Sequence, residues 1–372
     1  MIIALGEALI DMVPEKDNTG RDIYVPCLGG SPYNTAIAAG RILGNKKGPR
    51  AAFLSRLSRD FFGEALVRHL KQNKVSTDLI IRSNENTTLA FVKLEANKEP
   101  VYIFYTEGAA DRSLLPTDIP AELPAGTNCL SFGSISLTME PSAGTIENFI
   151  FRESARPDGP VISHDPNVRP MMIRDRESYV RRFENWVRAS AIVKISSADF
   201  DFIYPGLGLE KSMEKVLALI SSRNPGFSRN PGFGGNPGPK LLAVTLGADG
   251  AVALFQHGGG ADAGAADGSA LLRVSVPVFN LPLADTIGAG DTFHGALLAW
   301  LEDHGFMSRA ALAALTENSL REALVFANKA AAIVCSRKGA NPPTLEEMAQ
   351  FPTGNCGQFP TGNCELPTGN CG

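Results

Sequence analysis

The segment Asp285-Thr286-Ile287-Gly288-Ala289-Gly290-Asp291-Thr292-Phe293-His294-Gly295-Ala296-Leu297-Leu298 places three small residues between two aspartates, directly before an apolar run. Glycines allow the backbone to turn tightly and to bring its N–H groups close to a ligand. The run from Thr292 to Leu301 predicts a buried helix, because its apolar residues occupy most of the helix circumference. A helix that begins at such a turn presents unpaired N–H groups and a positive dipole end, which suits an anionic phosphate.

Asp291 stands at the start of this predicted helix. An anion-binding turn beside an ionised carboxylate can move a phosphoryl group onto an alcohol. The carboxylate accepts the hydroxyl proton, and the N–H groups stabilise the charge that gathers on the phosphate. Many α/β proteins use a small-residue turn only to pack a helix close to a sheet, so the turn on its own leaves both interpretations open.

Length, composition and charge limit the class of protein. The chain has 372 residues, 44% of them hydrophobic, and a net charge of −4, so it can bury a large core. This small charge gives no electrostatic reason to expect nucleic-acid or membrane-surface partners. No apolar stretch approaches the roughly 20 residues of a membrane helix, and the run Met1–Gly6 is too short for a signal peptide. We therefore expect a soluble, cytoplasmic protein.

Cysteine spacing bears on metal and disulfide sites, and two repetitive segments bear on the limits of the domain. The six cysteines show no C-x-x-C pair and no histidine cluster, which argues against a zinc site or a disulfide framework. Three N-P-G units within residues 224–239 predict successive turns of a surface insertion. Residues 349–372 repeat P-T-G-N-C three times and predict an inert, low-complexity tail after one domain of residues 1–348.

A β-α-β rhythm predicts the fold class. Strands and helices alternate from residue 129 onward, and this alternation implies a parallel sheet covered by helices on both faces. The expected strands are 50–58, 129–132, 161–165, 192–195, 240–246, 251–256 and 270–276. The expected helices are 60–73, 141–155, 176–188 and 322–336.

Strands near 20–27 and 88–106 do not follow this rhythm. A small sheet that interrupts a parallel fold predicts a lid, whose closure would exclude water from a site beneath it. The exposed face of so small a sheet is also a natural surface for a homodimer contact.

The N-terminal region predicts one further ligand-binding edge. Ile2 to Ala8 reads as an apolar strand, and Asp11 follows it; α/β proteins place ligands just past the carboxyl ends of parallel strands. Next, Gly29-Gly30-Ser31-Pro32-Tyr33-Asn34 predicts a helix running to about Leu43. Ser31 is expected to be its N-cap and Pro32 to occupy its first turn.

Two of these motifs together resemble the signatures of the ribokinase/fructokinase (PfkB-type) family of sugar kinases. D-T-x-G-A-G-D matches the C-terminal signature, and G-G-x-x-x-N matches the N-terminal one. The resemblance covers about residues 1–348. It implies a ribokinase-like three-layer α/β/α fold with a central, mainly parallel sheet and a small β-sheet lid. It also implies that Asp291 is the catalytic base and that the backbone of Gly288, Ala289 and Gly290 forms the anion hole.

The resemblance further implies a sugar site. Asp11, within G-E-A-L-I-D, would accept hydrogen bonds from sugar hydroxyls, and Gly30 and Asn34 would hold the sugar. Arg169, within D-P-N-V-R, would neutralise phosphate or bond to the sugar. A turn carboxylate at Asp11 and a surface cation at Arg169 are the structural alternatives.

ATP, Mg²⁺ and a monovalent cation such as K⁺ are the ligands that the family implies. Asp199 stands where the family usually has glutamate, and a contact to Mg²⁺ through water tolerates the shorter side chain, because Mg²⁺ keeps several waters. Asp285 would help to hold the monovalent cation. The expected nucleotide-binding residues are Lys194, Ser196, Thr245, Gly247, Gly250 and Asn328.

The substrate expected from the resemblance is D-fructose, phosphorylated to fructose 6-phosphate. The motifs G-E-A-L-I-D, E-G-A-A-D and D-P-N-V-R-P look most like those of bacterial fructokinases. 2-Keto-3-deoxygluconate and ribose are close alternatives, and an adenosine-type nucleoside is a more distant one. A non-catalytic sugar- or nucleotide-sensing protein is the alternative of another class, but a pure binder needs no base at Asp291. A dinucleotide oxidoreductase is excluded, since no G-x-G-x-x-G follows the first strand.

Overall fold

The computed structural model describes the chain except residues 45–47, 95–99, 222–239, 258–270 and 352–372. The N-P-G insertion and the repeated tail beyond residue 351 therefore lie outside the described residues. The expected end of the domain at residue 348 falls within the last helix, α10 (Leu345–Gln350).

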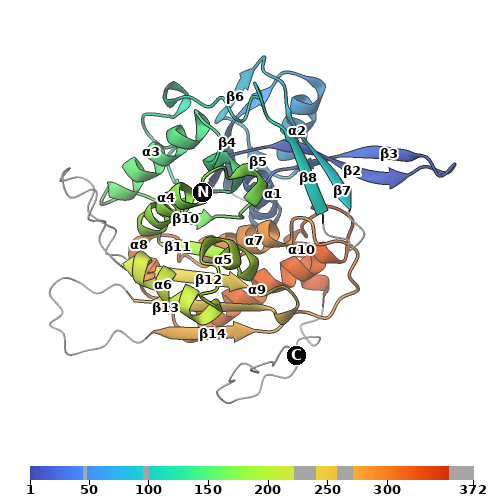
Figure 1. Ribbon diagram of the computed structural model, residues 1–372. Helices are drawn as coiled ribbons and strands as arrows, with labels where there is room; N and C mark the ends of the chain where they lie inside the picture. The colour runs from blue at the N-terminus through green and yellow to red at the C-terminus, as the bar shows by residue number, and fades with distance from the viewer. Residues whose placement is uncertain (45–47, 95–99, 222–239, 258–270, 352–372) are drawn as a thin grey trace, which may run out of the picture.

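A ten-stranded sheet forms the centre of the molecule (Figure 1). Its pairing from β12 to β5 is parallel throughout, and β13 and β14 extend one edge in antiparallel pairing. The order is β14 (Leu272–Val276), β13 (Ala251–Gln256), β12 (Lys240–Thr245), β11 (Ile192–Ser196), β10 (Val161–Asp165), β9 (Cys129–Gly133), β1 (Ile2–Leu5), β4 (Ala51–Ser58) and β5 (Val75–Ser76), with β6 (Ile80–Ser83) also paired to β4. The predicted mainly parallel α/β sheet is confirmed.

Side-chain alternation along the strands separates two cores. Ile2 and Ala4 pack on one side of the sheet, whereas Ile3 and Leu5 pack on the other, as the two-residue period of a strand requires. The first core is covered by α1 (Ser31–Leu43), α2 (Phe61–Gln72), α7 (Ala289–Asp303), α8 (Arg309–Leu312), α9 (Glu317–Cys335) and α10. The second is covered by α3 (Ser142–Ala155), α4 (Arg176–Ala189), α5 (Ser197–Ile203) and α6 (Leu209–Ser221). Helices on both faces give the expected three layers.

A separate four-stranded sheet projects from one end of the molecule (Figure 1). Its order is β3 (Asp22–Gly29), β2 (Leu9–Lys16), β7 (Thr88–Leu94) and β8 (Pro100–Tyr105). Strands β3, β7 and β8 confirm the predicted lid strands. The prediction of one strand over Ile2–Ala8 was wrong, because β1 ends at Leu5 and the apolar run continues as lid strand β2. Asp11 consequently lies within the lid.

Three predicted helix starts also need correction. Gly30 and not Ser31 is the N-cap of α1, with φ of 110°, so the Ser31 hydroxyl is free for a tertiary contact. Helix α7 begins at Ala289, three residues before the expected start, because the glycine turn itself enters the helix. Helix α9 begins at Glu317, where Thr316 accepts a hydrogen bond from the backbone N–H of Ser319.

Candidate active site

Helix α7 begins at the glycine-rich turn that the sequence singled out. Gly288 is its N-cap and has φ of 74°, a left-handed conformation that favours glycine. A Cβ on Gly288 would lie 2.6 Å from the Cβ of Ala340, so the turn packs directly on the loop after α9. The first backbone N–H groups of α7 follow this turn, which is the arrangement that binds anions at helix N-termini.

Asp291 lies in the first turn of α7 and is buried, with 7% of its surface exposed. Its Oδ1 accepts a hydrogen bond from the Ser31 hydroxyl at 2.7 Å, and its Oδ2 accepts one from the Asn34 amide at 2.9 Å. A third, longer bond of 3.4 Å comes from the Asn167 amide. These three donors fix the orientation of the carboxylate between α1, α7 and the segment after β10.

Close packing of α1 on α7 makes this cluster possible. A Cβ on Gly295 would lie 2.6 Å from the backbone oxygen of Thr35, so only a glycine allows the helices to approach this closely. The sequence predicted a role for Asn34 in holding a sugar, and the structure shows its amide already engaged with Asp291. Ser31 was missed, since its assignment as an N-cap left no reason to consider its hydroxyl.

Asp11 and Arg169 lie near Asp291 without bonding to it. Asp11 shares a lid face with Ala90 and Phe104, which belong to a cluster packed on the body of the protein. Burial raises the pKa of Asp11 to about 7; the Arg169 charge opposes this shift, and the Asp291 charge adds to it. The guanidinium of Arg169 donates to Asn167 Oδ1 at 2.7 Å. The lid carboxylate, this arginine and Asp291 thus belong to one electrostatic group.

Gly30 lies at the junction of lid and body. Its φ is 110°, and a Cβ there would lie 2.7 Å from the backbone oxygen of Glu7. The Glu7 side chain, 1% exposed, accepts hydrogen bonds from the backbone N–H groups of Ser31 at 3.2 Å and Ser136 at 3.1 Å. Burial raises the pKa of Glu7. Sequence reasoning missed this residue, although an acidic residue inside the apolar N-terminal run was the available signal.

Lys194 forms a fully buried ion pair beneath the Gly288–Gly290 turn. Its Nζ lies 3.0 Å from Asp165 Oδ2, and both side chains are less than 5% exposed. A Cβ on Gly290 would lie 2.8 Å from the same Nζ, so the ammonium lies directly under the turn. Burial lowers the pKa of Lys194, but Asp165, Asp199 and Asp291 outweigh this effect and the pKa is raised. Lys194 was expected to bind nucleotide, and in the structure its first partner is Asp165.

The surroundings destabilise the charged form of Asp165, whereas they stabilise the charged form of Lys194. Burial raises the pKa of Asp165 to about 6, the ammonium of Lys194 lowers it, and the charges of Asp199 and Asp291 raise it further. The charges of three carboxylates, one of them in direct contact, therefore act on one buried ammonium of β11. The excess of negative charge is of the kind that a hydrated cation neutralises.

Ser196 and Asp199 form a capping box at the N-terminus of α5. Asp199 Oδ2 accepts from the backbone N–H and the hydroxyl of Ser196, at 2.9 and 2.7 Å, and its Oδ1 accepts from the backbone N–H of Val168 at 2.8 Å. The carboxylate thereby joins the start of α5 to the segment that carries Arg169. Oxygen atoms accept more than one bond, so these contacts leave capacity for a metal-bound water.

Three of the remaining nucleotide-binding candidates lie at the end of β12 and in the turn that follows it, and Asn328 lies on α9. Thr245 ends β12, and Gly247 and Gly250 have positive φ angles of 60° and 88° in the turn that follows. A Cβ on Gly250 would lie 2.9 Å from Pro277 Cα, and the amide of Asn328 donates to the Pro277 oxygen at 2.6 Å. The structure thus brings Gly250 and Asn328 together around Pro277.

Asp285 connects two loops at the start of the signature. Its Oδ1 accepts from the backbone N–H of Ile287 at 3.0 Å, and its Oδ2 accepts from that of Gly339 at 2.9 Å. The backbone N–H groups of Ala284 and Asp285 both donate to the Cys335 oxygen. The Asp285 region and the loop after α9 are therefore in direct contact. In the described part of the chain, no group of three or more His, Cys, Asp or Glu side chains forms a ready metal site.

Comparison with known proteins decides the family. The family model described as "pfkB family carbohydrate kinase" matches residues 1–348. The chain belongs to the pfkB family of carbohydrate kinases. The chain is 35% identical over 321 residues to a fructokinase of Rhizobium leguminosarum bv. trifolii, covering 86% of each protein. It is 31% identical to fructokinase-1 of Zea mays, covering 94% of this chain and 97% of the relative.

Solved structures agree with the pfkB assignment. The fructokinase of Xylella fastidiosa with bound ATP has 27% sequence identity and a TM-score of 0.75, covering 94% of this chain and 96% of that one. The expected ribokinase-like fold and the carbohydrate kinase class are confirmed. Among the described residues, no helix combines the length and apolar character needed to cross a membrane.

Proposed function

We propose that this pfkB kinase transfers the γ-phosphoryl group of ATP to the primary hydroxyl of D-fructose, giving fructose 6-phosphate. The observation that carries the proposal is the buried carboxylate of Asp291, held by Ser31 and Asn34 in the first turn of α7, beside the Gly288–Gly290 turn. Relatives named fructokinase, at 31–35% identity over most of the chain, support the sugar.

In this mechanism Asp291 accepts the proton of the sugar hydroxyl as that oxygen attacks the γ-phosphorus. The bond from the γ-phosphorus to the bridging oxygen of ADP breaks, and the backbone N–H groups of Gly288, Ala289 and Gly290 stabilise the charge on the transferring group. Asp11, Gly30, Asn34 and Arg169 position the sugar. Phosphoryl transfer of this kind depends mainly on positioning and electrostatic stabilisation.

The acidic surroundings of Lys194 fit a magnesium–nucleotide complex. Asp165, Asp199 and Asp291 supply an excess of carboxylate oxygens, which are the ligands and water acceptors that Mg²⁺ prefers. Mg²⁺ would neutralise phosphate charge there, with Asp199 holding one of its waters. Asp285 would help to hold K⁺ between its two loops. Lys194, Ser196, Thr245, Gly247, Gly250 and Asn328 are the proposed ATP-binding residues.

The test is an ADP-release assay with Mg-ATP against fructose, ribose, 2-keto-3-deoxygluconate, glucose and adenosine, with and without K⁺. The highest kcat/KM is expected with fructose. Preference for ribose or 2-keto-3-deoxygluconate would retain the chemistry at Asp291 and overturn the choice of sugar. Absence of turnover from folded protein would favour a sensing role.

Asp11 provides a direct test of the sugar site. Asp11→Ala is expected to raise the KM for fructose roughly 10–100-fold, because a carboxylate accepting from a hydroxyl contributes about 1.5–3 kcal/mol. The KM for ATP should change little. Asp17→Ala, which removes a partly buried carboxylate just beyond the end of β2, is the matched control and should leave both constants unchanged. An unchanged fructose KM in Asp11→Ala would remove Asp11 from the site.

The raised pKa of Asp11 predicts a pH effect. Since burial raises this pKa to about 7, the carboxylate becomes protonated in the free enzyme as the pH falls below 7 and loses acceptor capacity. The kcat/KM for fructose should therefore decline below pH 7, approaching a tenfold fall per pH unit. Asp11→Asn should lose this inflection; its persistence in Asp11→Asn would assign the titration to another group.

The outer face of the lid suits a second copy of the chain. Pairing in the lid places Tyr24, Phe91, Ile103 and Tyr105 on the face opposite Asp11, and Ile103 and Tyr105 are about 60% exposed. We extend the proposal to a homodimer formed through this face. Sedimentation of the wild type and of Ile103→Glu tests it, with a monomer expected only for the variant.

The proposal also includes a cytoplasmic location, where ATP is abundant. It further includes a single domain over residues 1–348.

A further inference from the structure

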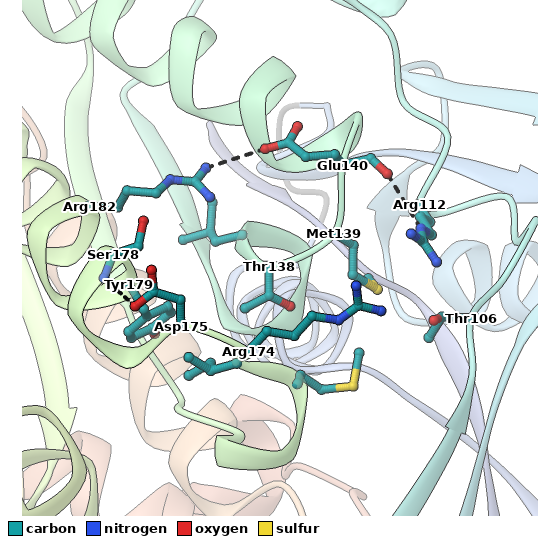
Figure 2. Close-up of a pocket in the computed structure, with 13 residues that line it drawn as sticks. Thr106, Arg112, Thr138, Met139, Glu140, Arg174, Asp175, Ser178, Tyr179 and Arg182 are labelled. Atoms are coloured by element: carbon teal, nitrogen blue, oxygen red, sulfur yellow. Dashed lines mark hydrogen bonds and ion pairs between the residues drawn. The ribbon is translucent and has the colours of Figure 1, made fainter.

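A cavity of about 390 Å³ lies beside the lid, outside the candidate active site. It is lined by residues that follow lid strand β8, by residues after β9, by residues after β10 and by one side of α4 (Figure 2). Asp11, Asn34, Arg169 and Asp291 do not line it. The cavity is therefore distinct from the place where the sugar and the γ-phosphate are proposed to meet.

Three arginines line this cavity, Arg112, Arg174 and Arg182, together with the carboxylates of Glu140 and Asp175, the second of which caps α4 by accepting from the Ser178 N–H. Arg182 is neutralised, since it lies 2.9 Å from Glu147 and 3.8 Å from Glu140. Arg112 makes one long hydrogen bond of 3.4 Å, to the backbone oxygen of Glu140. Within the described parts of the chain, Arg174 has no hydrogen bond or ion pair, and neither Arg112 nor Arg174 has a carboxylate partner.

Figure 2 shows the Arg174 side chain extending across the cavity toward Arg112 and Thr106. Two guanidinium groups without carboxylate partners repel each other when they line one small space, and an anion between them relieves that repulsion. The guanidinium fork matches the oxygens of a phosphate, and the Thr106 hydroxyl adds a further donor.

The rest of the lining indicates the size of the ligand. The cavity falls in the range typical of small-molecule sites and exceeds what a bare phosphate fills. Leu137, Met139, Met172 and Ile173 add an apolar wall that can contact a carbon skeleton. We propose that this cavity is a second anion site that binds the phosphate group of a small phosphomonoester between Arg112 and Arg174.

The position of the site gives it a consequence for the lid. Thr106 directly follows lid strand β8, whereas Arg174 lies in the segment after β10 that also carries Arg169. A phosphate bound to both Thr106 and Arg174 would connect the base of the lid with the body of the enzyme.

Isothermal titration of the full-length chain tests the proposal. The protein is first saturated with Mg²⁺, a non-hydrolysable ATP analogue and fructose, so that the Gly288–Gly290 turn is occupied. It is then titrated with inorganic phosphate and, separately, with glycerol 3-phosphate, at an ionic strength matched with chloride. Binding of at least one is expected, and the tighter of the two distinguishes free phosphate from a phosphomonoester.

Three variants locate the binding. Arg112→Ala and Arg174→Ala should each weaken it about tenfold or more, the scale of one lost charge-assisted hydrogen bond. Arg181→Ala, which removes an exposed arginine of α4 outside the cavity, should bind as the wild type does. No binding of either compound at millimolar concentration would overturn the proposal, as would equal binding by all four proteins. Circular dichroism confirms that each variant is folded.

Discussion

Asp291→Asn is expected to lower turnover by roughly 10²–10⁴-fold, the usual contribution of a general base, with little change in folding. The amide is isosteric with the carboxylate: its oxygen can still accept from the Asn34 amide, and its NH2 group can donate to the Ser31 hydroxyl oxygen. What it cannot do is take a proton from the sugar hydroxyl. Steady-state kinetics with fructose and Mg-ATP measure the effect, and a larger loss in kcat than in substrate binding is expected.

A matched control exists on the same helix. Asp303 is the last residue of α7 and is about half exposed, in an ion pair with Arg50. Asp303→Asn removes a carboxylate from the opposite end of α7 and should leave turnover within about twofold of the wild type, because surface ion pairs contribute little. Retained turnover in Asp291→Asn would remove Asp291 from the role of base.

Lys194→Met is expected to cost about 3–5 kcal/mol in the free energy of unfolding, because it leaves Asp165 buried without its partner. Methionine has a similar length, so the loss comes from charge and not from a cavity. Denaturant unfolding at neutral pH measures the effect. The deficit should shrink in acid: burial already raises the folded-state pKa of Asp165, so its protonation at low pH relieves the unpaired charge.

The double variant Lys194→Met/Asp165→Asn separates charge from packing. Removing both charges should recover most of the lost stability, since replacing a whole buried pair is far less costly than removing one partner. Turnover should stay low in the double variant, because the ammonium under Gly290 is absent. Equal instability of the single and double variants would show that Lys194 contributes through packing alone.

Hydrophobic patterning was sufficient to predict most of the fold. The strands from β9 to β12 and the helices α3 and α4 were predicted to within a few residues, because buried parallel strands read as short apolar runs between amphipathic helices; α5 and α6 were not among the expected helices. The lid strand β2 was not recognised, since Ile2–Ile10 is apolar almost throughout and nothing in its period marks the change of sheet at Gly6. Its assignment required the pairing with β3 and β7.

A site residue could be predicted where it belongs to a sequence motif, but not where its role depends on a contact with a residue distant in the sequence. Asp291 and Asn34 lie in recognisable signatures, but the bond between them joins residues 257 positions apart. The roles of Ser31 and Glu7 depend on such tertiary contacts, and so does the pairing of Lys194 with Asp165. A pattern of residue types predicts which chemistry is present, whereas partners are set by packing.

The most direct measurement is identification of the product. The protein is incubated with fructose and Mg-ATP, and the phosphorylated hydroxyl is assigned by phosphorus–proton correlation in NMR spectra, with Asp291→Asn as the paired sample. Fructose 6-phosphate in the wild type, and almost none in the variant, is the expected result. Phosphate on another hydroxyl would contradict the proposed placement of the sugar, and ATP hydrolysis without a sugar phosphate would contradict phosphoryl transfer to fructose.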